Sequence, residues 1–158
     1  MADGVTHLAT AALPSAWSRH RAWPLVGLGT VLPDVASRAP GLALERVAKV
    51  VPLPEAVFWP WGVLHEPVGY VLLAGVVSGA FRPEDRRLAW RALVSGGVLH
   101  WIVDVLQDHH GVGYRWLAPF SGWRWELGWI GSEATVVAAP FLAVATLVGM
   151  AAHTRRRG

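Results

Sequence analysis

Residues 134–152 read ATVVAAPFLAVATLVGMAA, a run of 19 residues without a charge, and three consecutive arginines follow at 155–157. A helix needs about 20 predominantly apolar residues to cross the hydrocarbon core of a bilayer. We therefore expect residues 134–152 to form a membrane-spanning helix. A soluble helical protein would have to bury this run in a core that a chain of 158 residues can barely enclose, so a soluble fold ranks below a membrane fold.

The composition of the whole chain agrees with a membrane protein. Of its 158 residues, 53% are hydrophobic and 16% are charged, against about 25% charged residues in an ordinary soluble domain. The length suits one domain, and we expect a single membrane-embedded, all-α domain over residues 1–158. The 14 basic residues exceed the 11 acidic ones by only three and form no single dense basic face, so nucleic acid is not an expected partner.

Four further apolar segments complete the expected architecture. Residues 62–81 and 88–107 are each long enough to cross the bilayer, and the charged turn between them predicts a helical hairpin. Residues 5–17 and 22–36 are apolar but short, which predicts a pair of tilted or partly buried helices. The chain is therefore predicted to be a polytopic bundle of about four helices.

Two polar segments are expected to form loops on the extracytoplasmic side. The first, 37–60, contains four prolines and has room for one short interfacial helix, and the second, 108–126, is rich in glycine and tryptophan. In this topology nine arginines lie on the opposite side and five basic residues on the loop side, as the positive-inside rule requires. We expect a multi-pass protein of the cytoplasmic membrane, surrounded by the lipid bilayer, with its C-terminus in the cytoplasm. A cleaved signal peptide is not expected, because Asp3 replaces the usual positive charge.

The same topology places five isolated polar residues at one level of the membrane. His100 and Asp104 are four residues apart and therefore share one face of their helix. Because the chain has no cysteine, a metal site would have to use imidazole and carboxylate donors, as zinc, iron or manganese sites without sulfur do. Such a site can generate a hydroxide for hydrolysis. The candidate ligands are His7, Asp34, His65, His100 and Asp104.

Ordinary structural roles are open for the same residues. His100 and Asp104 can be a buried pair that ties helices together, since polar side chains stabilise helix contacts in lipid. Asp34 can cap a turn, and His7 can lie at the membrane interface. Asp108, His109 and His110 can be ordinary solvated residues of a loop.

The order of several short motifs resembles a known family. From the N-terminus these are Thr6-His7, Leu32-Pro33-Asp34, Gly62-x-x-His65, His100-x-x-x-Asp104, Gly111 and the segment 116–121. Together they resemble the small bacterial and archaeal inner-membrane proteins described as LexA-regulated, membrane-bound, predicted metal-dependent hydrolases. The resemblance implies a compact bundle of about four membrane helices with a His/Asp metal site, similar to helical zinc-dependent phospholipases C. It implies the same five residues as ligands.

One departure from the family pattern lies just before His65. The family usually has a His-Arg pair where this chain has Pro60 and Trp61, which removes one potential ligand and one cation that could hold an anionic substrate. Either Glu66 together with His109 or His110 replaces them, or the chain has kept the fold and lost the activity.

Two functions from different classes follow. The first is a metal-dependent hydrolase with zinc or manganese as cofactor and Asp108 or Glu66 as general base, acting on a phosphoester or ester of a lipid-like substrate at the extracytoplasmic face. The second is a non-catalytic helical subunit that packs against a membrane protein partner through small residues such as 95–97 and Gly75-x-x-x-Gly79. Bound metal with converging side chains favours the first function, and scattered side chains with copurifying partners favour the second.

Overall fold

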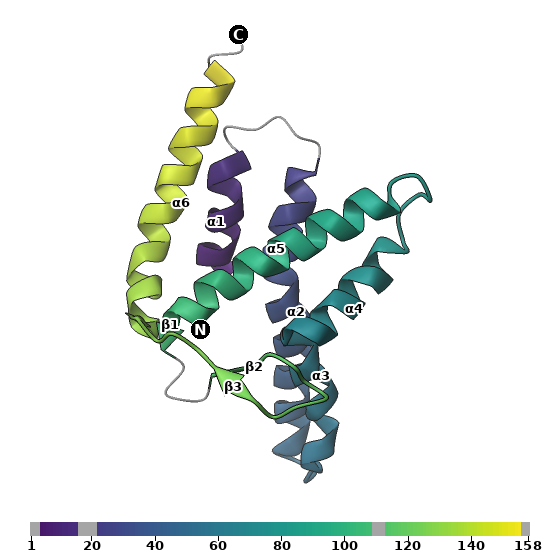
Figure 1. Ribbon diagram of the computed structural model, residues 1–158. Coiled ribbons are helices and arrows are strands. Elements are labelled where there is room, and N and C mark those ends of the chain that lie inside the picture. Colours follow the sequence, from purple (N-terminus) through teal and green to yellow (C-terminus); the bar gives the residue numbers. More distant parts are fainter. Residues whose placement is uncertain (1–3, 16–21, 109–112, 156–158) are drawn as a thin grey trace.

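The computed structural model of the chain describes residues 4–15, 22–108 and 113–155 (Figure 1). The described part is 71% helical, which confirms the expected all-α class. Its α-helices are α1 (Gly4–Ser15), α2 (Trp23–Ala48), α3 (Trp59–His65), α4 (Pro67–Ser78), α5 (Arg86–Leu106) and α6 (Ser132–Arg155). A short 3-10 helix, η1 (Glu55–Val57), precedes α3.

Four two-residue strands lie between α5 and α6. Strand β1 (Gln107–Asp108) pairs in parallel with β4 (Ile130–Gly131), and β2 (Tyr114–Arg115) pairs antiparallel with β3 (Arg124–Trp125). They lie within and just after the expected polar segment 108–126. This segment is fastened to the end of α5, because the backbone N–H of Leu127 donates to the carbonyl of Val105 at 2.8 Å.

Helix α2 is much longer than predicted. Residues 37–60 were expected to form a loop because of their prolines, but the helix continues through Pro33 and Pro40 to Ala48. A proline inside a helix leaves the carbonyl four residues earlier without its N–H donor. For Pro33 that carbonyl belongs to Gly29, and the Tyr70 hydroxyl of α4, which lies 3.0 Å from it and 2.9 Å from the Leu93 carbonyl, shares its one proton between the two. The tertiary contact thus satisfies the group that the proline leaves unpaired.

The predicted continuous helix over residues 62–81 is wrong. It is divided at Glu66 into α3 and α4, and the segments 55–65 and 67–78 meet at an angle of 76°. Pro67 explains the break, since a residue before proline is driven out of the helical region, and Glu66 has the extended angles φ −79° and ψ 152°. This break turns the end of α3, including His65, toward the interior.

Helix length supports fewer membrane spans than predicted. In the described segments, α5 alone is long and apolar enough to cross a bilayer, and the bent 55–65/67–78 pair meets the criterion only if it counts as one broken span. The expected helix over 134–152 is present within α6, where Val137–Val148 is a shorter apolar stretch. A polytopic bundle of four spans is therefore not established by helix length.

Large apolar side chains cover much of the outer surface. On α6, Phe141 and Leu147 are 72% and 66% exposed, and on α4 the values for Leu72 and Val76 are 68% and 76%. Figure 1 shows α6 standing beside α1 at one edge of the molecule, so its outer face has no described neighbour. Such a surface suits a lipid environment better than water.

The centre of the fold is the crossing of α2 and α5 (Figure 1). Gly29 and Gly96 face each other there, and a Cβ on either glycine would collide with backbone atoms of the opposite helix. Gly97 is covered by the Tyr70 ring in the same way. The small residues around position 96, which were expected to allow a partner to approach, thus serve contacts within this chain.

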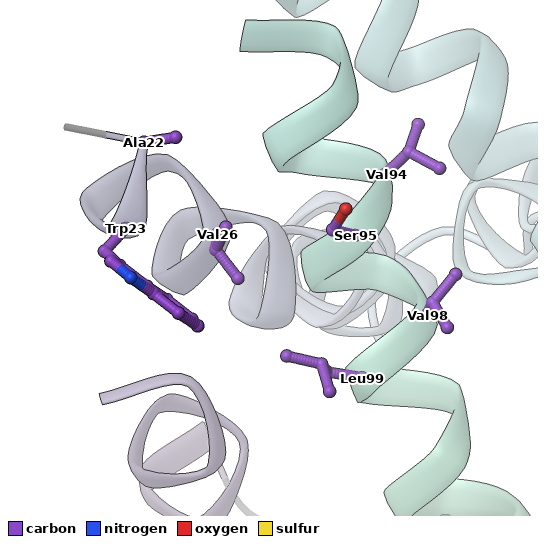
Figure 2. A pocket seen from close by; sticks show the side chains of 7 residues that line it. All are labelled: Ala22, Trp23, Val26, Val94, Ser95, Val98 and Leu99. Carbon is purple, nitrogen blue, oxygen red and sulfur yellow. The ribbon is translucent and has the colours of Figure 1, made fainter. Parts of the chain in front are cut away.

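An apolar groove lies beside this crossing (Figure 2). Trp23 and Val26 of α2 line one wall, and Val94, Val98 and Leu99 of α5 line the other. None of the described residues that line it carries an ionisable side chain. The groove therefore offers no acid, base or metal donor, and the chemistry of the molecule has to be sought elsewhere.

Candidate metal centre

The structure brings all five predicted ligands together. His7 comes from α1, Asp34 from the middle of α2, His65 from the last residue of α3, and His100 and Asp104 from the end of α5. Four of them are almost completely buried, with exposures of 1% for His7, 0% for His100 and Asp104, and 6% for Asp34. The side chain of His65 is 12% exposed and forms the outer boundary of the cluster.

Asp104 lies at the centre of the cluster. Its Oδ1 is 3.2 Å from His7 Nε2, and its Oδ2 is 3.2 Å from His100 Nε2 and 3.8 Å from His65 Nε2. Asp34 approaches the same imidazoles from α2, with Oδ1 3.3 Å from His65 Nε2 and Oδ2 3.8 Å from His7 Nε2. Each of the three imidazoles thus lies close to at least one of the two carboxylates.

A backbone hydrogen bond sets the orientation of His100. Its Nδ1 lies 2.9 Å from the carbonyl oxygen of Thr30, and a carbonyl can only accept, so Nδ1 carries the proton. In the neutral ring Nε2 is then an acceptor, and it faces His65 Nε2 at 3.1 Å. A carbonyl on the distal nitrogen is the common way in which proteins fix a metal-ligating histidine. The Pro33-containing helix α2 supplies both this carbonyl and Asp34.

The donor atoms of the cluster fit a divalent cation. Two overlapping groups, His7 with Asp34 and His100, and His65 with His100 and Asp104, each place their donor atoms within 4.8 Å of one another. Among the described residues, the carboxylate oxygens of Asp34 and the ring nitrogens of His7 are buried and make no well-formed hydrogen bond, and their only close polar contacts are ion pairs with Arg38, His65 and Asp104. Such atoms are costly unless something binds them. Nitrogen and oxygen donors without sulfur suit zinc, manganese or iron.

Tyr114 is a member of the site that the sequence did not indicate. Its hydroxyl donates to Asp104 Oδ2, and its ring stacks on His65 with a centroid distance of 5.3 Å. Burial first, and then the Asp104 carboxylate, raise the pKa of the Tyr114 hydroxyl far above its usual range. The hydroxyl therefore stays a proton donor and holds the central carboxylate in place. A single tyrosine within a polar segment gives no sequence signal for this role.

Comparison with known proteins places the chain in a membrane protein family. The model of the YdjM inner membrane protein family matches residues 3–158, almost the whole chain. The chain belongs to this family. No curated protein and no solved structure matches the chain. The membership confirms that the protein resides in the inner membrane in contact with lipid, and it is silent on LexA regulation and on hydrolysis.

The two carboxylates predicted as general base in this YdjM-family protein lie outside both metal-binding groups. Glu66 accepts two hydrogen bonds from Arg115, from its side-chain Nε at 3.1 Å and from its backbone N–H at 3.0 Å. Asp108 is half-buried in β1, four residues after Asp104 and past the end of α5. His109 and His110, predicted as replacement ligands, lie outside the described residues.

We expect Tyr114→Phe to weaken metal binding by roughly 10- to 100-fold, because the residue that orients a ligand carboxylate typically contributes that much to affinity. Metal titration of the detergent-purified protein measures the effect. Tyr70→Phe is the matched control, since it removes a buried hydroxyl that bonds helix carbonyls but touches no ligand. It should lower the unfolding temperature and leave metal affinity unchanged. Equal metal affinities of Tyr114→Phe and the wild type would contradict the role of Tyr114.

Proposed function

We propose that the protein is a membrane-bound, metal-dependent hydrolase that cleaves a phosphoester or ester bond in a lipid-like substrate. The observation that carries this proposal is the buried convergence of three imidazoles and two carboxylates from four helices, in two groups whose donor atoms lie within 4.8 Å of one another. Two carboxylates buried next to each other destabilise a fold unless their charges are compensated, and a bound divalent cation would provide that compensation.

Each residue has a role in this proposal. His7, Asp34, His65, His100 and Asp104 would hold one or two zinc or manganese ions, with Tyr114 and the Thr30 carbonyl fixing the ligands. A bound divalent ion supplies Lewis acidity and lowers the pKa of water toward neutrality. Of the two predicted bases, we assign the role to Asp108, because both carboxylate oxygens of Glu66 already accept hydrogen bonds from Arg115.

The proposed topology is that of a multi-pass protein with a cytoplasmic C-terminus. It is supported by the arginines in the turn between α4 and α5 and after 152, which the positive-inside rule assigns to the cytoplasm. The cluster, at the opposite end of α5, would then face the extracytoplasmic side. All described helices contribute to one domain in this proposal.

Elemental analysis of the detergent-purified protein, prepared without chelator, tests the metal site. We expect stoichiometric zinc or manganese in the wild type and its loss in a His100→Ala, Asp104→Ala double variant that keeps its helix content. The loaded wild type is then assayed on p-nitrophenyl phosphate and on phosphatidic acid for release of nitrophenol or phosphate. Absence of metal from a folded wild type would overturn the proposal and favour the non-catalytic membrane subunit.

A further inference from the structure

A second, polar groove of about 490 Å³ borders the metal centre at His65. It lies between α2, which contributes Arg38, Leu42 and Glu45, and the end of α3, with Arg115 of β2 closing it. His65 belongs both to the cluster and to the groove wall. A molecule in the groove would therefore touch the outer boundary of the cluster.

Each arginine of the groove is anchored by a buried carboxylate. Arg38 Nε lies 3.1 Å from Asp34 Oδ1, one helical turn earlier, and Arg115 Nε donates to Glu66 Oε1 at 3.1 Å. The side chains of Arg38 and Arg115 remain 43% and 26% exposed. Each guanidinium group is thus anchored by a carboxylate on one side and keeps part of its surface exposed at the groove.

The terminal nitrogens of Arg115 are directed along the groove wall. Among the described residues, none accepts a hydrogen bond from them, and Nη2 lies 3.4 Å from the position that a Cβ on Gly62 would occupy. A glycine at position 62 therefore leaves the guanidinium uncovered. Since a guanidinium presents five N–H donors in a planar fork, the donors not used by Glu66 match the oxygens of a phosphate.

We propose that this groove binds the anionic phosphate group of a lipid, held between Arg38 and Arg115 with the phosphorus next to His65. The inference rests on the proposed function, because it names the substrate class of that same centre.

The charges and the apolar wall of the groove favour a lipid phosphate over other anions. Arg115 with Glu66 is neutral, and Arg38 with Asp34, Asp104 and one divalent ion would carry a single positive charge. Glu45 lies farther out, almost two helical turns beyond Arg38, where it disfavours a second negative group. Leu42, 59% exposed and one turn beyond Arg38, offers apolar surface for the first part of an acyl chain.

Calorimetric titration of the purified protein with dihexanoyl phosphatidic acid tests the proposal, alongside inorganic phosphate and dihexanoylglycerol. We expect the phosphatidic acid to bind, and Arg115→Gln and Arg38→Gln each to weaken it by about tenfold or more through loss of a charge-assisted hydrogen bond. Arg46→Gln, an exposed position on the same helix as Arg38, is the matched control and should stay within about twofold of the wild type. Weaker binding of inorganic phosphate than of the lipid would assign the groove to a lipid headgroup.

The proposal would be wrong if both arginine variants fold and bind phosphatidic acid with the wild-type affinity. It would also be wrong if dihexanoylglycerol, which has no phosphate, binds as tightly as phosphatidic acid. Arg115→Gln removes the partner of Glu66 and can prevent folding. In that case the lipid affinity of Arg38→Gln, on the opposite wall, tests the proposal. Tighter binding of free phosphate than of the lipid would also overturn the lipid assignment. If the metal-loaded protein binds the lipid through these arginines but has no activity, the groove proposal is confirmed and the hydrolase proposal is wrong. If the protein is active and neither arginine substitution changes lipid binding, the hydrolase proposal is confirmed and the groove proposal is wrong.

Discussion

Asp104→Asn is expected to remove the metal from the protein almost completely while leaving its helices in place. The asparagine has the same shape and still accepts the Tyr114 hydrogen bond, but it carries no charge and is a poor ligand. Asp104 is within 3.2 Å of two imidazoles and contributes to the centre more contacts than any other carboxylate there. Elemental analysis should therefore find close to one ion per wild-type chain and almost none per variant chain.

Thermal unfolding gives the same prediction a second readout. A ligand present at about 100 times its dissociation constant stabilises the folded state by about 2.7 kcal/mol, which raises the unfolding temperature of a domain of this size by roughly 5–10 °C. Added zinc should produce this increase in the wild type and none in Asp104→Asn. The zinc-dependent increase is the readout, and not the absolute unfolding temperature, because the variant also loses the ion-pair contacts of Asp104 with His7 and His100.

Asp108→Asn is the control that distinguishes the loss of a metal ligand from the loss of the proposed general base. It lies four residues after Asp104 and outside both metal-binding groups. It should keep the metal and the zinc-dependent stabilisation but lose phosphoester hydrolysis. Metal loss in Asp108→Asn equal to that in Asp104→Asn would show that the centre extends into β1 and would contradict the division of roles proposed above.

The composition of the site could be predicted from the sequence because its residues stand out locally. His100 and Asp104 share a helix face by their spacing, and His7, Asp34 and His65 are isolated polar residues in apolar surroundings. The prediction that these five residues meet in space depends on the expected topology, which places all of them on the extracytoplasmic side of the membrane. The structure places them together, although the topology differs in detail, since α3 and α4 do not form one helix.

The supporting contacts could not be predicted, because each joins residues far apart in the chain. The Tyr70 hydroxyl, 41 residues from Gly29, lies within hydrogen-bond distance of the carbonyl that Pro33 leaves without an N–H donor. Pro40, which together with other prolines suggested a loop over 37–60, also lies inside the helix. Glu66 and Arg115 are 49 residues apart, and their pairing removes from the site a carboxylate that the sequence offered as a base. Proline and carboxylate patterns describe local preferences, and these tertiary partners override them.

Gly29→Ala is expected to lower the free energy of unfolding of the protein by about 3 kcal/mol. The new Cβ would lie 3.0 Å from the Cα of Gly96 and closer still to the carbonyl oxygen of Leu93, so α2 and α5 would have to move apart. Both contacts are backbone atoms, which cannot turn aside as a flexible side chain does. Circular dichroism of thermal unfolding in detergent, after removal of metal, measures the change.

Gly41→Ala on the same helix is the matched control. A Cβ at position 41 meets no atom within 4 Å, so the substitution should stabilise α2 by roughly 0.5–1 kcal/mol through its helix propensity. The two alanines make the same chemical change on one helix, with opposite expected signs. If Gly29→Ala proved as stable as Gly41→Ala, close contact of the two helices would not be what holds the centre of the fold.

The same substitution links the helix crossing to the metal centre. Thr30 and Asp34 follow Gly29 on α2, while His100 and Asp104 follow Gly96 on α5, so the distance between the helices sets the distance between the two halves of the ligand set. Gly29→Ala should therefore weaken metal binding although every ligand is retained, and Gly41→Ala should not. Metal titration of both variants, under conditions where both remain folded, would show a site whose affinity depends on backbone contact outside the ligands themselves.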